Sequence, residues 1–195
     1  MMAKILVLCG HPRAGSFSEA LASAYAEAAK QAGHTVTEVA LSTLPVGLEV
    51  PDYGDFKRQG TAPDWVLTLQ AQIAACDHWV IVTPMWWGGV PAKLKALFDA
   101  VLLPGFAFRY RTDSPWWDRL LAGRSARVIV TADTPGFFFR WVYGKPLLRQ
   151  LKGQILGFCG FAPVRFSYLA PLRSSTPDQR QAWLQTAAAL GRAGA

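Results

Sequence analysis

Two hydrophobic patterns alternate along the chain. Unbroken apolar runs, such as Lys4–Cys9 and residues 78–83, are typical of strands that are covered on both faces. Between these runs, apolar residues recur every three or four positions, which predicts amphipathic helices. The predicted strands are residues 4–9, 35–41, 78–83, 127–132 and 164–169, and the predicted helices are 17–31, 64–75, 91–102, 145–158 and 175–190.

Two segments fit neither pattern. Residues 42–63 are dense in proline and glycine, and the stretch after residue 102 carries Phe106, Phe108, Tyr110, Trp116 and Trp117, so both are predicted as loops. Strands that alternate with helices form a parallel sheet with helices on both faces. Because no repeat or linker divides the chain, we predict one α/β domain over residues 1–195.

Ligands of such sheets bind beyond the carboxyl ends of the strands, where the strand order reverses. The loops after the first, third and fourth strands should therefore meet. These loops are residues 10–18, 84–89 and 133–139.

The first loop, GHPRAGSFSE, is suited to an anion. Ser16 and Glu19 form an S-x-x-E capping box, and the N–H groups of a helix start attract phosphates. His11, Arg13, Ser16 and Ser18 could bind phosphate oxygens. The loop lacks both G-x-G-x-x-G and G-K-[ST], so it favours a flavin mononucleotide tail over ATP. A capped helix with no ligand remains the alternative.

The second loop, PMWWGG, follows a buried strand. A single tryptophan is usually a core residue, whereas Trp86 and Trp87 together at a strand end favour a flat heteroaromatic ligand. Met85 lies beside them, and Gly88 and Gly89 let the backbone approach such a ligand closely. Backbone N–H groups could bind its polar edge.

The third loop, TADTPGFFFRWVYG, mixes hydroxyl groups with aromatics. Thr131 and Thr134 could contact the ring edge or its sugar chain, and residues 137–139 could wall the pocket or pack against another subunit. In GFAFRY, residues 105–110, aromatics at alternate positions predict an interface or a ligand wall.

Composition narrows the function classes. The chain is 51% hydrophobic and 17% charged, which excludes a disordered protein, and its apolar runs are shorter than the ~20 residues of a membrane span. The basic N-terminus resembles a signal peptide, but its apolar run is short and no cleavage site follows, so we predict a cytoplasmic protein. Cys9, Cys76 and Cys159 are widely spaced and predict buried thiols rather than a metal site.

The net charge of +7 is uneven. Residues 1–100 hold seven Lys/Arg and nine Asp/Glu, whereas residues 101–195 hold thirteen and four. The arginines are scattered and no nucleic-acid motif accompanies them, so we predict no nucleic-acid partner. The basic half is either a solvated surface or attracts an anionic dinucleotide, for which Arg140 and Arg149 are candidates.

The motifs HPRAGSFS, TPMWWGGVPAKLKALFD, GFAFRY and ILGFCGF are similar to those of the flavodoxin-like NAD(P)H:quinone oxidoreductase family, almost end to end. The resemblance implies a doubly wound five-stranded parallel sheet of order 2-1-3-4-5. It implies that phosphate and ribityl oxygens are held by His11, Ser16, Phe17 and Ser18, and that the isoalloxazine ring is bordered by Pro84, Met85, Trp86, Trp87 and Gly88. It also implies a homodimer in which Phe108 and Tyr110 reach the partner's site.

The chain departs from that family at the third loop. The family's T-T-G-G falls on Thr131, Ala132, Asp133 and Thr134, which remain cofactor-binding candidates. Its tyrosine and histidine fall on Phe139 and Lys145. Phenylalanine cannot donate a hydrogen bond, so the family's proton relay is absent or rebuilt here. Phe139 and Trp87 are candidates for the substrate site, and we expect Lys145 to offset negative charge on the flavin.

The resemblance implies a flavin-dependent enzyme that passes a hydride from NAD(P)H to a quinone or similar aromatic in a ping-pong reaction. No side chain need act as a nucleophile. FMN is favoured over FAD because the chain ends soon after its last helix. The alternatives are a flavodoxin-type electron carrier and a regulatory subunit of a potassium-efflux system with a peripheral membrane partner.

Overall fold

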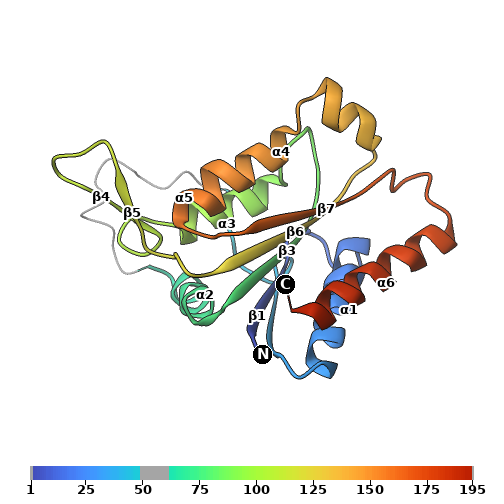
Figure 1. The fold of residues 1–195 in the computed structure, drawn as a ribbon, viewed down its shortest axis with the longest axis horizontal. Coiled ribbons are helices and arrows are strands. Elements are labelled where there is room, and N and C mark those ends of the chain that lie inside the picture. The colour runs from blue at the N-terminus through green and yellow to red at the C-terminus, as the bar shows by residue number, and fades with distance from the viewer. Residues whose placement is uncertain (1, 49–61, 195) are drawn as a thin grey trace.

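The predicted alternation of strands and helices is confirmed by the structure, a computed structural model that describes residues 2–48 and 62–194 (Figure 1). Five parallel strands form the central sheet: β1 (Lys4–Cys9), β2 (Thr35–Ala40), β3 (His78–Pro84), β6 (Ser125–Thr131) and β7 (Val164–Leu169). Their order is β2-β1-β3-β6-β7, which is the predicted 2-1-3-4-5 once the two strands outside this sheet are set aside.

Helices cover both faces of the sheet (Figure 1). On one face α1 (Phe17–Gln31) packs against α6 (Pro177–Ala193). The other face carries α2 (Asp64–Ala75), α3 (Ala92–Val101) and a longer helical segment composed of α4 (Pro146–Arg149), η3 (Gln150–Leu156) and α5 (Gly157–Cys159). The doubly wound fold is therefore as predicted.

The core explains why the apolar runs became central strands. Every residue of β3 is buried, and each face of the sheet carries its own hydrophobic cluster. In the larger cluster Trp79 lies between Phe98 and Phe161, with ring centroids 6.1 and 5.6 Å away. Strands that are buried on both faces cannot alternate polar and apolar side chains, so they read as continuous apolar runs.

Two predictions of local structure were wrong. The segment after residue 102 contains a hairpin of β4 (Phe108–Tyr110) and β5 (Trp117–Arg119), and the third loop contains a π-helical turn, η2 (Phe138–Val142). The helix predicted over residues 145–158 is confirmed as a helical segment from Pro146 to Cys159, whose central part is π-helical. Of the predicted loop 42–63, residues 49–61 lie outside the described residues, and the flanking residues are irregular.

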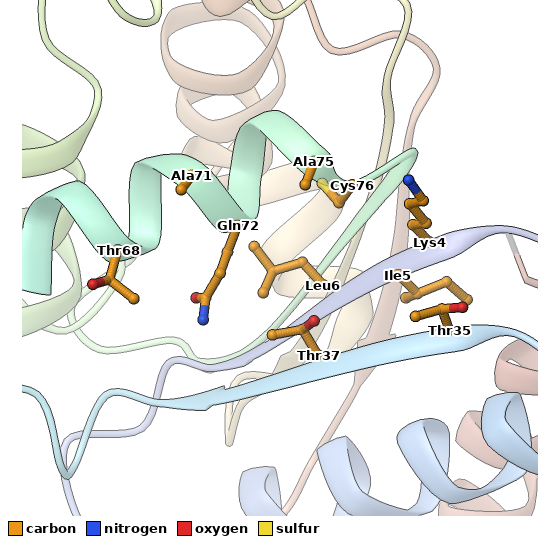
Figure 2. A pocket seen from close by; sticks show the side chains of 10 residues that line it. All are labelled: Lys4, Ile5, Leu6, Thr35, Thr37, Thr68, Ala71, Gln72, Ala75 and Cys76. Atoms are coloured by element: carbon orange, nitrogen blue, oxygen red, sulfur yellow. The ribbon is translucent and has the colours of Figure 1, made fainter.

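A hollow of about 520 Å³ lies at the amino-terminal ends of the strands, between α2 and the strands β1 and β2. Figure 2 shows Gln72 pointing from α2 toward Leu6 and Thr37. The opposite ends of the same strands carry the three predicted ligand loops. Within the described ranges, no helix is both long enough and apolar enough to span a bilayer.

Candidate functional site

The loops after β1, β3 and β6 start side by side at the carboxyl edge of the sheet. Gly10 N–H donates to the Val82 carbonyl (2.7 Å), and Met85 N–H donates to the Thr131 carbonyl (2.8 Å). The buried hydroxyl groups of Ser18, at the start of α1, and Thr131, at the end of β6, lie 3.3 Å apart. The predicted meeting of these three loops is confirmed.

The start of α1 leaves backbone donors open to an anion. Ser16 caps the helix, since its hydroxyl oxygen accepts the Glu19 N–H (3.2 Å). The Glu19 carboxylate accepts the N–H of Gly15 (2.6 Å) rather than that of Ser16, so the expected capping box is displaced by one residue. The N–H groups of Phe17 and Ser18 bind no acceptor in the described part of the chain. They remain available for a phosphate.

The side chain of Phe17 does not face this anion position. Its ring lies 6.2 Å from the ring of Trp183, and the Arg180 guanidinium lies 5.9 Å above it. Both of these residues belong to α6. Phe17 can therefore serve a phosphate only through its backbone N–H.

His11 joins the first loop to the second. Its ring meets the Trp86 indole edge-on, with centroids 5.7 Å apart, and its Nδ1 accepts the N–H of Arg13 (3.1 Å). Burial lowers the pKa of His11, which favours the neutral ring. The side chain of Arg13 is exposed, so it can supply the positive charge at this end of the site.

The tryptophan pair lies on a tight turn that holds one indole in solvent. Trp86 and Gly89 exchange both backbone hydrogen bonds (2.9 Å each). Between them Trp87 and Gly88 have φ values of +51° and +77°, the pattern of a type I′ turn. Trp87 is 106% exposed and Trp86 is 45% exposed. The structure thus places a flat apolar surface at the tip of the loop after β3, as the sequence suggested.

Two residues in the described part of the chain adopt a left-handed backbone without being glycine, and they flank the same contact. They are Trp87 and Lys145, with φ values of +51° and +57°. A methyl group added at Gly88 would lie 3.4 Å from Cγ of Pro146, so the residues that follow Trp87 and Lys145 lie close to each other. Such conformations cost about 1 kcal/mol each and concentrate at functional sites.

The third loop has most of its polar groups occupied by the protein. Ala132 N–H donates to the Leu169 carbonyl, and the Asp133 carboxylate accepts the N–H of Arg173 (2.7 Å). The Thr134 carbonyl accepts the hydroxyl hydrogen of Tyr168 (2.8 Å). These bonds fix the path of the loop. Of the two threonine hydroxyls, that of Thr131 already meets Ser18, and that of Thr134 has no partner in the described residues. The backbone N–H groups of Asp133 and Thr134 also bind no acceptor in the described residues.

Phe139 is more deeply buried than expected for a side chain that forms the wall of an open pocket. It is 3% exposed, and its ring stacks on Tyr168 with centroids 4.4 Å apart and planes within 3°. Burial raises the pKa of Tyr168 to about 12, so its hydroxyl stays protonated as the donor to Thr134. Phe137 and Phe138, by contrast, are exposed.

Phe108 and Tyr110 lie in a different part of the molecule. Their rings are 5.2 Å apart, and Phe108 packs on Phe158 of α5. Both line a largely apolar groove of about 770 Å³ between α3 and η3. Figure 1 shows the β4–β5 hairpin at the opposite side of the molecule from η2. Within one chain, these two residues do not meet the three loops.

Sequence reasoning missed two residues that shape this edge. Tyr168 holds Thr134 and supports Phe139, and Pro146 contacts Gly88. The alternation of Phe166 and Tyr168 along β7 was a signal that one face of this strand is covered by aromatic groups. No sequence signal indicated the contact of Pro146.

Comparison with known families places residues 3–191 under a model described as the flavodoxin-like fold. Among curated relatives, "FMN-dependent NADH:quinone oxidoreductase" of Nitratidesulfovibrio vulgaris is 28% identical over 201 residues, which cover 93% of this chain and 92% of that protein. "NAD(P)H dehydrogenase [quinone] 1" of Rattus norvegicus is 26% identical over 200 residues, which cover 91% of this chain and 72% of that protein.

A solved structure has the same architecture. Smu.1420 from Streptococcus mutans UA159 superposes with a TM-score of 0.81 at 28% identity, and the match covers 97% of this chain and 99% of that one. The resemblance therefore extends over the whole sheet and its three loops.

Proposed function

Because this chain belongs to the flavodoxin-like fold family, we propose that it is a flavin-dependent enzyme that uses NAD(P)H to reduce quinones or similar electrophilic aromatics. The observation that carries the proposal is Trp87, a fully exposed indole on a strained turn at the switch point of the sheet. The names of its relatives in Nitratidesulfovibrio vulgaris and rat support the activity.

The residues at this edge fit FMN. The free N–H groups of Phe17 and Ser18, with the hydroxyls of Ser16 and Ser18, suit a phosphate at the positive end of α1. Trp87 and Gly88 have backbone N–H groups that bind no acceptor in the described residues, and these suit the polar edge of a ring. The other side chains that we assign to FMN are those of His11, Arg13, Thr131 and Thr134. The backbone around the cofactor is formed by Pro84, Met85, Ala132 and Asp133.

FMN is favoured over FAD by the relatives as well. The bacterial relative that matches this chain over 92% of its own length is named as FMN-dependent. The start of α1 accounts for the one phosphate that FMN carries.

When bound, the flavin supplies the two-electron chemistry, and the protein supplies stacking, orientation and charge. Trp86 and Trp87 would hold the flavin ring against the loop after β3. The Thr131 hydroxyl, fixed by Ser18, holds its position beside β6. The exposed indole of Trp87 would offer the reductant, and then the acceptor, an aromatic surface on which to stack.

Lys145 offsets negative charge that develops on the flavin in this proposal. It has a left-handed backbone and lies beside the tryptophan turn, since Pro146 Cγ is 3.4 Å from where a Cβ of residue 88 would lie. Lys145→Asn removes the charge and keeps a residue that tolerates this backbone. Flavin reduction by NAD(P)H should slow about 10-fold, since one offset charge in a partly buried site is worth more than 1 kcal/mol. An unchanged rate between pH 6 and 9 would dismiss this role.

We also propose that the chain, over residues 1–195, is one domain, that it acts as a homodimer in the cytoplasm, and that Phe108 and Tyr110 line the substrate site of the partner subunit. Two core clusters on one sheet support the single domain, and three buried free cysteines suit a reducing compartment. The apolar groove at the hairpin, remote from η2 in the same chain, supports the exchange of these residues between two copies. Light scattering of the flavin-loaded protein measures the assembly directly.

The decisive experiment is to purify the protein, release and identify its pigment by mass spectrometry, and mix the loaded protein anaerobically with NADH or NADPH. Bleaching of the flavin absorbance, followed by reoxidation with a quinone, is the expected result. A stable one-electron state with no NAD(P)H oxidation would indicate an electron carrier. Co-purification with a membrane transport protein, without turnover, would indicate a regulatory subunit.

A further inference from the structure

A second hollow borders the site, between β7, η2 and the start of α4, with a volume of about 560 Å³. Its aromatic lining comes from β7 and from η2 with the residue that precedes it. These aromatics are Phe137, Phe139, Trp141, Phe166 and Tyr168. Figure 1 shows η2 (gold) standing away from the body of the sheet.

The aromatic lining has a floor and a rim. The stacked pair of buried Phe139 and half-buried Tyr168 forms the floor. At the rim, Phe137 and Trp141 are 64% and 73% exposed, although large aromatic side chains are costly to leave in water. A flat ring entering between rim and floor would cover them by stacking, as nucleotide bases do on aromatic side chains.

The charged side chains that line the hollow are all positive. Arg140 and Lys145 are the charged residues around this hollow, and it has no carboxylate among its lining residues. Neither cation forms an ion pair with any residue in the described ranges. The backbone fixes their spacing, because Tyr143 N–H donates to the Phe138 carbonyl and Lys145 N–H to the Phe139 carbonyl (2.9 Å each). Two fixed cations suit a ligand group with more than one negative charge.

We propose that this hollow binds the adenosine diphosphate end of NAD(P)H, an inference that rests on the proposed function. The loop of residues 131–139 runs from the candidate flavin contacts to the hollow, and the bond from Tyr168 to Thr134 ties the two together. With its nicotinamide at Trp87, the dinucleotide places its pyrophosphate between Lys145 and Arg140. The adenine stacks on Trp141.

Calorimetry of ADP binding to the flavin-loaded protein tests the hollow without turnover. Arg140→Gln should weaken ADP binding about 10-fold, the effect of losing one charge-assisted hydrogen bond. Lys152→Gln, which removes the same charge from an exposed position outside the hollow, should leave ADP binding unchanged. Equal ADP affinity in wild type and Arg140→Gln overturns the proposal.

Steady-state kinetics assign the ligand to the reductant. Arg140→Gln should raise KM for NADH about 10-fold, with little change in kcat, and should leave KM for reduced nicotinamide mononucleotide, which lacks the adenosine end, unchanged. A rise of equal size for both reductants overturns the proposal. So does ADP inhibition that is competitive with the quinone and not with NADH, because the hollow would then hold the acceptor.

The two proposals fail separately. If ADP binds through Arg140 and no NAD(P)H is oxidised, the enzyme function fails and the nucleotide site stands. If NADH is oxidised at normal rates while Arg140→Gln affects neither ADP binding nor KM, the enzyme function stands and the nucleotide site fails.

Discussion

The two ends of the central sheet each carry a hollow and a hydrogen-bonded pair of polar side chains, yet their backbones differ. At the amino end, His78 and Ser125 join β3 to β6 at 2.8 Å, and the hollow beside α2 is lined by residues of which none has a positive φ. At the carboxyl end, Ser18 and Thr131 join α1 to β6, while Trp87 is left-handed and fully exposed.

This contrast indicates that the amino-end hollow is a gap in packing, whereas the carboxyl end is a binding site. The amino-end hollow is bordered mainly by threonines and small apolar side chains on regular strands and on α2, which water can cover at little cost. The carboxyl end keeps a large apolar side chain exposed on a strained turn, and both features cost free energy. A cost of this kind is retained where a ligand offsets it. The four variants below test whether the two ends differ in this way.

The largest expected effect is acid destabilisation at the amino end. His78 is 2% exposed, and burial, aided by Arg127 and Arg165, lowers its pKa to about 4. Because the folded pKa lies below the unfolded value of about 6.5, its contribution is complete above pH 6.5 and is lost as the pH falls toward 4. The free energy of unfolding should fall by about 3 kcal/mol from this group by pH 4.

Denaturant unfolding between pH 7.5 and 4 measures this loss. His78→Gln cannot take up the proton and should show a shallower pH dependence. Thr37→Val, in the nearby hollow, should keep the wild-type slope. Identical slopes for wild type and His78→Gln would remove His78 as the cause.

The second effect should be seen only at the carboxyl end. Ser18→Ala removes a hydroxyl that meets Thr131 and that we assign to the flavin phosphate. The dissociation constant of FMN should rise about 30-fold, or about 2 kcal/mol, the range for hydrogen bonds to charged groups. Ser125→Ala removes the matching hydroxyl at the amino end and should change stability but not FMN binding. Equal FMN affinity in both variants would contradict this assignment.

The third effect has opposite signs for stability and for binding. Trp87→Gly relieves the left-handed strain and should stabilise the flavin-free protein by about 1 kcal/mol. The same change removes the stacking surface, so FMN affinity should fall at least 10-fold. Thermal unfolding of the flavin-free protein and fluorescence titration with FMN measure the two quantities. If Trp87→Gly destabilised the flavin-free protein, the indole would contribute to folding through packing within the protein, and its exposure would not indicate a ligand site.

The smallest effect is expected in the amino-end hollow itself. Gln72→Ala enlarges this hollow without removing a hydrogen bond that the structure shows. Stability should change by less than about 0.5 kcal/mol, as for surface substitutions in general, and turnover should not change. A large loss of activity would show that both ends of the sheet serve the ligand.

The sequence predicted the regular elements closely because their signals are local. The boundaries of β1, α1, α2 and β7 coincide with the predicted residues 4–9, 17–31, 64–75 and 164–169. Apolar periodicity and the cap at Ser16 depend only on neighbours in the chain. Position at the switch point likewise follows from the order of strands, which the family resemblance supplied.

What the sequence did not show depends on contacts between distant residues. Three-residue strands such as β4 and β5 have too few positions to display a period. The π-helical turn at Phe138–Val142 and the left-handed Lys145 depend on tertiary contacts, and non-glycine residues rarely adopt the latter. For the same reason, Asp133 looked available to a ligand until its carboxylate was found on the N–H of Arg173.

The separation of the β4–β5 hairpin from the tryptophan turn has a genetic consequence. Suppose that each catalytic centre combines the tryptophan turn of one chain with the β4–β5 hairpin of the other. A chain with a defective turn and a chain with a defective hairpin can then together form one intact centre. Co-expression of a Trp87 variant with a Tyr110 variant, each inactive alone, should then restore one working centre in every heterodimer. Mixed assemblies with no recovered turnover would indicate that every centre is built from a single chain.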